Sequence, residues 1–267
     1  MDLKRILTTV IGLPLVIAVF IFGNKYVIGS VIFTASIICT YEYFKVIQKV
    51  CKPIKWVGYL ANILIIFAII LKEEMLIKSI LFSVPIVISL LFIQVLVTGM
   101  KTTFKDVAYT FLCIFYIPFF LMFLQLIRNL NNGKVLMGYV FVISWATDIF
   151  AYLIGRNFGK IKFSSISPKK TVEGCVSGII GSIIITLVYT LIVNKVLGVE
   201  YNYLYVAIIT LILSVLSQVG DFAASIIKRF ADTKDYGNII PGHGGMLDRI
   251  DSLLFIAPFA YMLFILI

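Results

Sequence analysis

Long runs without a charged residue divide this chain, and they constrain its fold more than any other feature. A transmembrane helix needs about 20 consecutive, mostly apolar residues. Nine runs reach this length, some of them only when a few flanking polar residues are included. They are 6–24, 26–41, 56–71, 79–100, 107–127, 135–147, 174–194, 201–220 and 252–267. The sequence is 61% hydrophobic and 13% charged, whereas soluble domains are about 25% charged. We therefore predict an all-α, polytopic integral membrane protein of about nine transmembrane helices.

The distribution of basic residues predicts an orientation. With the N-terminus in the cytoplasm and the runs alternating in direction, most of the 23 Lys and Arg residues fall in cytoplasmic loops, as the positive-inside rule requires. Because these charges border apolar helices, the net charge of +10 favours lipid headgroups and phosphate substrates over nucleic acid. The first run lacks a signal-peptide cleavage pattern, so we interpret it as a helix. We expect a multi-pass protein of a bacterial plasma membrane with its functional face in the cytoplasm.

The polar residues are unevenly spread along the chain. Before residue 134 the runs are almost purely aliphatic and aromatic, and the acids Glu42 and Asp106 lie near run ends, where an interfacial charge is cheap. After residue 140 polar residues concentrate in two loops, 156–173 and 230–247. We predict a transmembrane scaffold at 1–134 and a transmembrane catalytic half at 135–267. The four cysteines are scattered without a CxxC pair, and we interpret them as apolar packing.

One stripe of polar residues follows the run at 201–220. If residues 221–232 continue as one helix, a single face carries five polar residues, namely Asp221, Ser225, Lys228, Arg229 and Asp232. A carboxylate inside a membrane costs several kcal/mol unless it is paired or bound to a metal. A loop rich in Gly follows, and then a helix start that carries Asp248 and Asp251. Carboxylates, cations and a Gly-rich loop together suit phosphoryl or nucleotidyl transfer, in which hard oxygen ligands hold Mg²⁺.

These residues resemble a known family signature. Positions 225–251 read SIIKRFADTKDYGNIIPGHGGMLDRID, which resembles the pattern S-x-x-K-R-x4-K-D-x-G-x-x-[LIF]-P-x-H-G-G-x-x-D-R-x-D of the phosphatidate cytidylyltransferases, or CDP-diacylglycerol synthases. Positions 167–174 read SPKKTVEG and are similar to the family's S-P-K-K-T-x-E-G, and 148–156 resembles the segment before it. The resemblance is strong from about residue 140 onward and is limited to hydropathy before that.

The resemblance implies a reaction and a set of residues. CTP and phosphatidate would give CDP-diacylglycerol and pyrophosphate with Mg²⁺, leaving room for a second metal ion. Asp221 and Asp248 would be metal ligands, and Asp148 and Asp251 are further metal candidates. The catalytic group would comprise Asp221, Asp248, Asp251, Lys228, Arg229 and His243. The substrate-binding group would comprise Ser167, Lys169, Lys170, Thr171, Glu173, Ser225, Lys234, Asp235, Gly244, Gly245 and Arg249.

Several alternatives stay open at this point. His243 orients a phosphate or a loop carbonyl, or it works as an acid–base group. Asp148 and Asp251 bind metal, give hydrogen-bond support or brace an Arg, and Lys169 with Lys170 contacts phosphate or anchors the loop at the membrane. The rival functions are a CTP-dependent enzyme acting on another lipid, such as a polyprenol kinase, and a transporter that uses intramembrane carboxylates. The expected partners are CTP, phosphatidate and the lipid bilayer but no nucleic acid, and a homodimer is left open.

Overall fold

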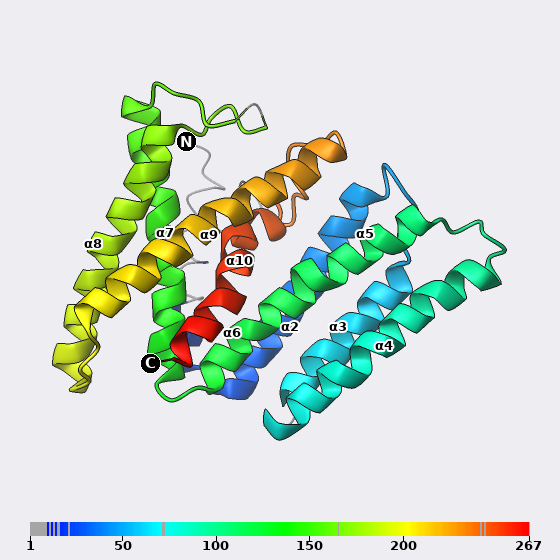
Figure 1. Ribbon diagram of the computed structural model, residues 1–267, viewed down its shortest axis with the longest axis horizontal. Coiled ribbons are helices and arrows are strands. Elements are labelled where there is room, and N and C mark those ends of the chain that lie inside the picture. The colour runs from blue at the N-terminus through cyan, green and yellow to red at the C-terminus, as the bar shows by residue number, and fades with distance from the viewer. Residues whose placement is uncertain are drawn as a thin grey trace. The chain divides into compact units, whose positions relative to one another are not determined.

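The computed structural model describes residues 10–266 except 11, 13, 15, 16, 21, 71, 72, 165, 241 and 243, and it leaves the side chains of 66–80 undescribed. Within these limits the chain is all-α, as the sequence predicts, with two isolated β-bridges in its loops. Figure 1 shows helices α2 (Lys25–Ile47), α3 (Lys55–Ile70), α4 (Glu73–Val97), α5 (Phe104–Ile114), η1 (Phe115–Phe119), α6 (Phe120–Asn129), α7 (Gly133–Phe158), α8 (Val172–Leu197), α9 (Tyr203–Phe230) and α10 (Leu247–Phe264).

The uncharged runs mark the helices. Each run from 26–41 onward overlaps an observed helix, whereas nine of the 19 residues of the run 6–24 lie outside the described residues. Among the residues that the structure describes, five helices are long and apolar enough to cross a membrane. They are Lys25–Ile47, Phe104–Asn129, Gly133–Phe158, Val172–Leu197 and Tyr203–Phe230. The protein is therefore an all-α membrane protein, and the count of about nine transmembrane helices stays a prediction.

The chain forms two compact units that interleave along the sequence. Unit 1 comprises Met1–Leu126 and Phe230–Arg249, and unit 2 comprises Ile127–Arg229 and Ile250–Ile267. The polar loop 231–246 thus belongs to unit 1, whereas the loop between α7 and α8 belongs to unit 2. The predicted division into a scaffold half and a catalytic half near residue 134 stays a prediction.

In unit 1, helices α2, α3, α4 and α5 pack side by side (Figure 1). The link between α2 and α3 is tied to α5, because Asp106 accepts the Lys52 N–H at 2.6 Å and Thr110 accepts the Ile54 N–H at 2.8 Å. Asp106 also completes a capping box with Thr103 at the start of α5. It lies near the end of a helix, as the sequence indicates, and it is only 4% exposed. Its backbone hydrogen bonds, rather than water, compensate the carboxylate.

In unit 2, α7 and α8 pack along their length (Figure 1). Glycines on α8 allow this approach: a Cβ added at Gly174 would lie 2.8 Å from the Ala151 carbonyl oxygen, and one at Gly178 would lie 2.9 Å from the Thr147 carbonyl oxygen. Small residues at a membrane helix interface let two backbones come close together. This packing brings the C-terminal end of α7 beside the start of α8, where the loop 159–171 joins them.

Candidate functional site

A cavity of about 620 Å³ lies in unit 2. Its walls come from α7, the loop between α7 and α8, the first turns of α8, and α9. The lining residues are Asp148, Ala151, Tyr152, Gly155, Arg156, Ser167, Lys169, Lys170, Thr171, Gly174, Cys175, Gln218 and Asp221. The structure thus brings together six residues that the sequence predicted, namely Asp148, Ser167, Lys169, Lys170, Thr171 and Asp221.

One face of α7 supplies polar side chains to this cavity. Asp148, Tyr152 and Arg156 are four residues apart, and this spacing places them on the same side of a helix. The Arg156 guanidinium donates a hydrogen bond to the Tyr152 hydroxyl at 3.0 Å. The Ser252 hydroxyl lies 3.4 Å from the Asp148 carboxylate. The face therefore combines a carboxylate, a phenol and a permanent cation.

The loop between α7 and α8 is held as a short hairpin. The Phe163 N–H donates to the Lys170 carbonyl and the Val172 N–H to the Ile161 carbonyl, both at 2.9 Å. Within the hairpin, the Lys170 N–H donates to the Ser167 carbonyl at 3.0 Å and closes a turn. The turn fixes the backbone that carries the two adjacent lysines of the cavity wall.

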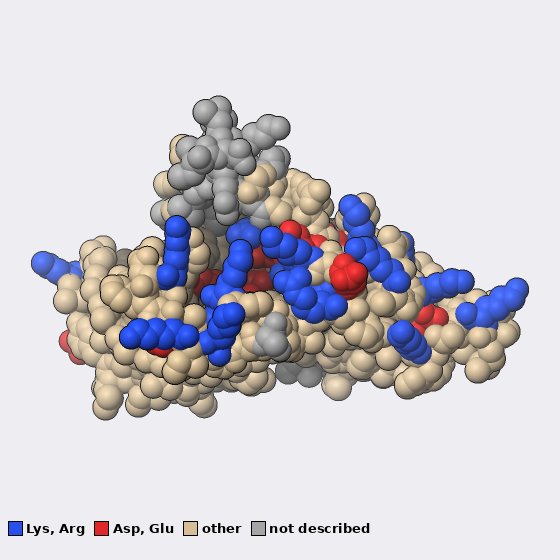
Figure 2. Space-filling view, turned by 90° about the horizontal axis from the view of Figure 1, so that it is seen from above, with Lys and Arg blue, Asp and Glu red and all other residues tan. Residues whose placement is uncertain are grey.

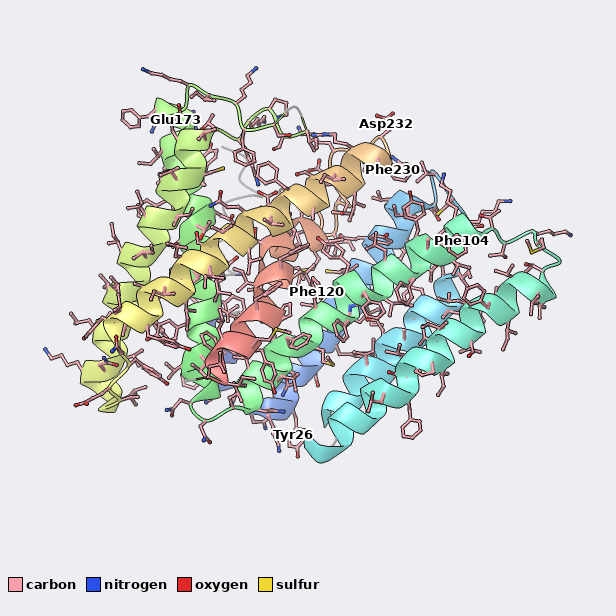
Figure 3. All side chains as sticks on the ribbon, viewed as in Figure 1. Tyr26, Phe104, Phe120, Glu173, Phe230 and Asp232 are labelled. Carbon is pink, nitrogen blue, oxygen red and sulfur yellow. The ribbon has the colours of Figure 1, made fainter. Side chains whose placement is uncertain are left out.

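Two side chains hold this hairpin to the start of α8. Thr171 is the N-cap residue, and its hydroxyl accepts the Gly174 N–H at 3.1 Å. The Glu173 carboxylate accepts the Ile161 N–H at 3.2 and 3.3 Å. Glu173 lies at the N-terminal end of α8 (Figure 3) and is not among the residues that line the described cavity. In this structure it braces the loop, and its predicted contact with substrate stays a prediction.

An ion pair crosses the cavity between the loop and α9. The Lys170 ammonium pairs with the Asp221 carboxylate, and the two side chains are 24% and 30% exposed. The same ammonium lies over the Phe222 ring, 4.0 Å from its centroid, in a cation–π contact. The pairing compensates a carboxylate in the middle of an apolar helix. Figure 2 shows one face of the molecule, on which Lys and Arg side chains are numerous and Asp and Glu lie among them.

The other predicted residues of unit 2 lie beside the cavity rather than in its lining. Asp251 on α10 is 8% exposed and interacts electrostatically with Asp221, Lys228 and Asp148. Ser225 and Lys228 are half-buried on α9, and Arg229 is exposed near its end. The Arg229 side chain reaches the loop, where its Nε lies 3.5 Å from the Ile166 carbonyl oxygen. Their functional roles stay predictions.

The predicted continuous helix through Asp232 was wrong. Helix α9 ends at Phe230, and Asp232 has a φ of 48° in the turn that follows. An aspartate tolerates this left-handed conformation better than most residues. The Phe230 ring stacks on Tyr109 with centroids 5.2 Å apart, and Figure 3 shows Phe230 at the C-terminal end of α9. This contact holds the helix end at the point where the chain turns.

The loop 231–246 of unit 1 is organised around Asp248. One oxygen of its carboxylate accepts the Tyr236 N–H at 2.9 Å and the Gly245 N–H at 3.1 Å. The Ile240 N–H donates to the Gly244 carbonyl at 3.0 Å and closes a turn. Gly244 has a φ of 85°, which favours glycine at this position. Asp248 therefore ties the backbone at Tyr236, inside the loop, to the backbone at Gly245, near the end of the loop.

The remaining predicted residues in and just after this loop differ in their exposure. Lys234, Asp235 and Arg249 are exposed, whereas Gly245 is buried. His243 lies outside the described residues, and its predicted role is not tested. Asp248 belongs to unit 1 and Asp221 to unit 2, so their joint binding of a metal stays a prediction.

Sequence reasoning missed several polar residues. Gln218 lines the cavity, and its side-chain amide donates to the Cys175 carbonyl at 3.1 Å, which joins α9 to α8. An amide three residues before Asp221, within an uncharged run, was an available signal. Glu42 drew attention only as an acid near the end of a run, and the structure adds that its side chain is 0% exposed. Its carboxylate accepts the N–H groups of Met246 and Leu247.

The two carboxylates that line the cavity of unit 2 suit a divalent cation whose coordination shell is completed by substrate. Asp148 and Asp221 line the same cavity, and Mg²⁺ is usually bound by one or two carboxylates together with water and substrate phosphates. Within the described part of the chain, no group of three or more His, Cys, Asp or Glu is arranged to hold a metal ion. Asp148 and Asp221 are two carboxylate donors of the kind that Mg²⁺ uses together with substrate oxygens.

Comparisons with known proteins agree with this chemistry. The model of the cytidylyltransferase family matches residues 3–267. A protein of Thermotoga maritima called phosphatidate cytidylyltransferase is 32% identical over 268 residues, which cover 98% of this chain and 96% of the relative. A Bacillus subtilis protein of the same name is 41% identical over 163 residues, and the match covers 60% of this chain and 59% of the relative. The match to a Staphylococcus haemolyticus protein of that name is 34% identical over 166 residues, 62% of each chain. This chain belongs to the cytidylyltransferase family.

Proposed function

We propose that this protein is a phosphatidate cytidylyltransferase. A phosphate oxygen of phosphatidate attacks the α-phosphorus of CTP, the bond from that phosphorus to the bridging oxygen breaks, and pyrophosphate leaves. CDP-diacylglycerol remains in the membrane. The observation that carries the proposal is the cavity of unit 2, in which Lys169, Lys170 and Arg156 lie with the carboxylates Asp148 and Asp221. The relatives named above support phosphatidate as the lipid.

Charge neutralisation is the main task of such a site. The phosphate of phosphatidate is largely ionised near pH 7, since the second pKa of a phosphate monoester is about 6, so the reaction needs little general base. Cations that are already in place lower the barrier by stabilising charge that develops in the transition state. Lys169, Lys170 and Arg156 supply this charge, and their division between CTP and phosphatidate is left open. The hairpin turn and the Thr171 cap hold the lysines in position.

Mg²⁺ is the proposed cation, with room for a second ion. When bound, it neutralises phosphate charge and aligns the reacting oxygens. Asp148 and Asp221 are the residues of the cavity that would hold it. In the described structure Asp221 is paired with Lys170, so a metal ion and the ammonium compete for one carboxylate. Participation of Asp248 and Asp251 is part of the proposal and rests on the family signature.

The membrane supplies the lipid substrate. Five described helices are suited to span a bilayer, and a diacyl substrate reaches a membrane-embedded enzyme without leaving the lipid. The excess of Lys and Arg in alternate loops supports a site on the cytoplasmic face of a bacterial plasma membrane. CTP is a cytoplasmic nucleotide, which agrees with that orientation. A homodimer is compatible with the proposal and is not required by it.

Release of labelled pyrophosphate from CTP tests the proposal. The purified protein is assayed in detergent with phosphatidate and Mg²⁺, beside Asp221→Asn and the control Lys195→Ala, which alters an exposed lysine at the end of α8. We expect lipid-dependent release that Asp221→Asn lowers by about 100-fold and Lys195→Ala leaves unchanged. A folded protein that consumes CTP with a polyprenol but not with phosphatidate would overturn the lipid assignment. Substrate flux across vesicles without CTP consumption would favour a transporter instead.

A further inference from the structure

Glu42 connects α2 to the polar loop of unit 1 across more than 200 residues of sequence. Its carboxylate accepts the Met246 N–H at 3.0 Å through Oε1 and the Leu247 N–H at 2.8 Å through Oε2. Leu247 is the first residue of α10. The first N–H groups of a helix have no partner within it, and a carboxylate at this end also interacts favourably with the helix dipole. Glu42 therefore caps α10 from a different helix.

The surroundings of Glu42 leave little space for another arrangement. Its side chain is 0% exposed. A Cβ added at Gly237 would lie 2.6 Å from Oε1, and one added at Gly245 would lie 2.7 Å from Oε2. Two glycines of the loop thus pack directly on the carboxylate. A carboxyl group so deeply buried is costly unless its hydrogen bonds are kept.

Asp248 shares this arrangement. It follows Leu247 in the first turn of α10, and it accepts the N–H groups of Tyr236 and Gly245. Glu42 holds the backbone of Met246 and Leu247, and Asp248 holds the loop just before it at Tyr236 and Gly245. A shift of the α10 N-terminus would move Asp248 and the loop together.

We infer that Glu42 is a positioning residue for cytidylyl transfer, which it serves by fixing the start of α10 and so the place of Asp248. The inference rests on the proposed function, because Asp248 matters to the reaction only if the enzyme is a cytidylyltransferase. Glu42 itself touches backbone N–H groups, and its role is exerted through Asp248 and the loop. A displacement of about 1 Å in a catalytic group lowers a rate by about 100-fold.

Asp106 provides a matched control. It is also a buried carboxylate of unit 1, and it accepts the N–H groups of Lys52 and Thr103. Asp106→Asn thus makes a comparable change, because its amide nitrogen cannot accept one of the two backbone N–H groups. Glu42→Gln is isosteric, but its amide nitrogen cannot accept one of the two N–H groups. Gly237→Ala disturbs the carboxylate from the loop side without removing it.

The test compares kcat, KM, the Mg²⁺ requirement and thermal stability of the purified full-length variants. We expect Glu42→Gln and Gly237→Ala to lower kcat by about 10- to 100-fold and to raise the Mg²⁺ concentration for half-maximal activity. If Asp106→Asn lowers the Tm as much as Glu42→Gln does, it should still keep the kcat of the wild type. If Asp106→Asn loses as much activity as Glu42→Gln at matched Tm, Glu42 is merely structural and the inference fails.

Amide hydrogen exchange separates this inference from the proposed function. In the wild type we expect slow exchange at Met246 and Leu247, which Glu42→Gln accelerates and Asp106→Asn does not. Fast wild-type exchange at these amides would overturn the inference even if the enzyme is active. A wild type that consumes no CTP with phosphatidate would overturn the function while the exchange result stands.

Discussion

The Lys170 ammonium and the Asp221 carboxylate form an ion pair inside the cavity of unit 2. Lys170 comes from the hairpin loop and Asp221 from the middle of α9, so the pair joins two segments that are 51 residues apart in number. Both groups are needed for phosphate chemistry in the proposed function. In the proposed function, the pair would keep a cation and a carboxylate next to each other until substrate and metal bind.

Replacement of Lys170 by Met tests this competition. The variant keeps the aliphatic stem but removes the ammonium, so Asp221 becomes available to a metal ion. We expect the Mg²⁺ concentration for half-maximal activity to fall by about fivefold, the scale of a partly exposed ion pair. The kcat should fall because a phosphate-neutralising cation is lost. Titration of activity with Mg²⁺ measures both effects. An unchanged Mg²⁺ requirement would contradict the competition, and Lys195→Met serves as the control.

The Thr171 cap gives a prediction on stability. Its hydroxyl accepts the Gly174 N–H at the start of α8, and loss of such a cap costs about 1 kcal/mol. We expect Thr171→Ala to lower the Tm in detergent, while Thr171→Ser keeps the hydroxyl and stays close to wild type. Intrinsic fluorescence during a thermal ramp gives the measurement. Equal stability of the Ala and Ser variants would show that the cap contributes nothing.

Close packing of α7 and α8 predicts the effect of a single methyl group. In Gly178→Ala the new Cβ would lie 2.9 Å from the Thr147 carbonyl oxygen, so the two helices must move apart. Overpacking of this kind costs about 1–3 kcal/mol. Val176→Ala, at a 51% exposed side chain of the same helix, should change stability little. Denaturation midpoints of both variants provide the comparison, and a Gly178→Ala protein as stable as wild type would refute the packing argument.

The thiol of Cys51, between α2 and α3, should react slowly with alkylating agents. Burial, together with the nearby Asp106 carboxylate, raises the pKa of the Cys51 thiol from its ordinary value of 9.0 to about 11. Since the thiolate is the reactive form, the labelling rate should still rise between pH 9 and 11. The raised pKa also lowers the free energy of unfolding as pH rises from 9 to 11, because the thiol loses its proton more readily in the unfolded chain than in the folded one. Mass spectrometry of the Cys51 peptide after iodoacetamide pulses measures the profile, and a rate that levels off below pH 9 would contradict it.

Hydrophobic pattern alone located most of the helices. The uncharged runs from 26–41 onward each overlap an observed helix, because a backbone in lipid must satisfy its hydrogen bonds locally. The helix ends were less accessible. Polar periodicity continued from Asp221 to Asp232, yet α9 ends at Phe230, where the ring stacks on Tyr109. That contact joins residues far apart in the chain, and no local sequence pattern indicates it.

The candidate site shows the same division. The motif at residues 167–174 and the acid Asp221 predicted five of the residues that line the cavity, because phosphate chemistry calls for those residue types. Gln218 escaped notice, since a single polar residue in an apolar run gives no sign of the partner it will meet.

The sequence by itself determined the all-α membrane architecture, the family and most of the charged residues around the cavity. These properties depend on hydrophobicity and on short motifs, both of which are local. Only the tertiary structure decided that Asp221 pairs with Lys170 and that Glu42 caps α10. Burial makes an unpaired carboxylate costly, so each one must find a partner. Which partner it finds depends on how distant helices pack.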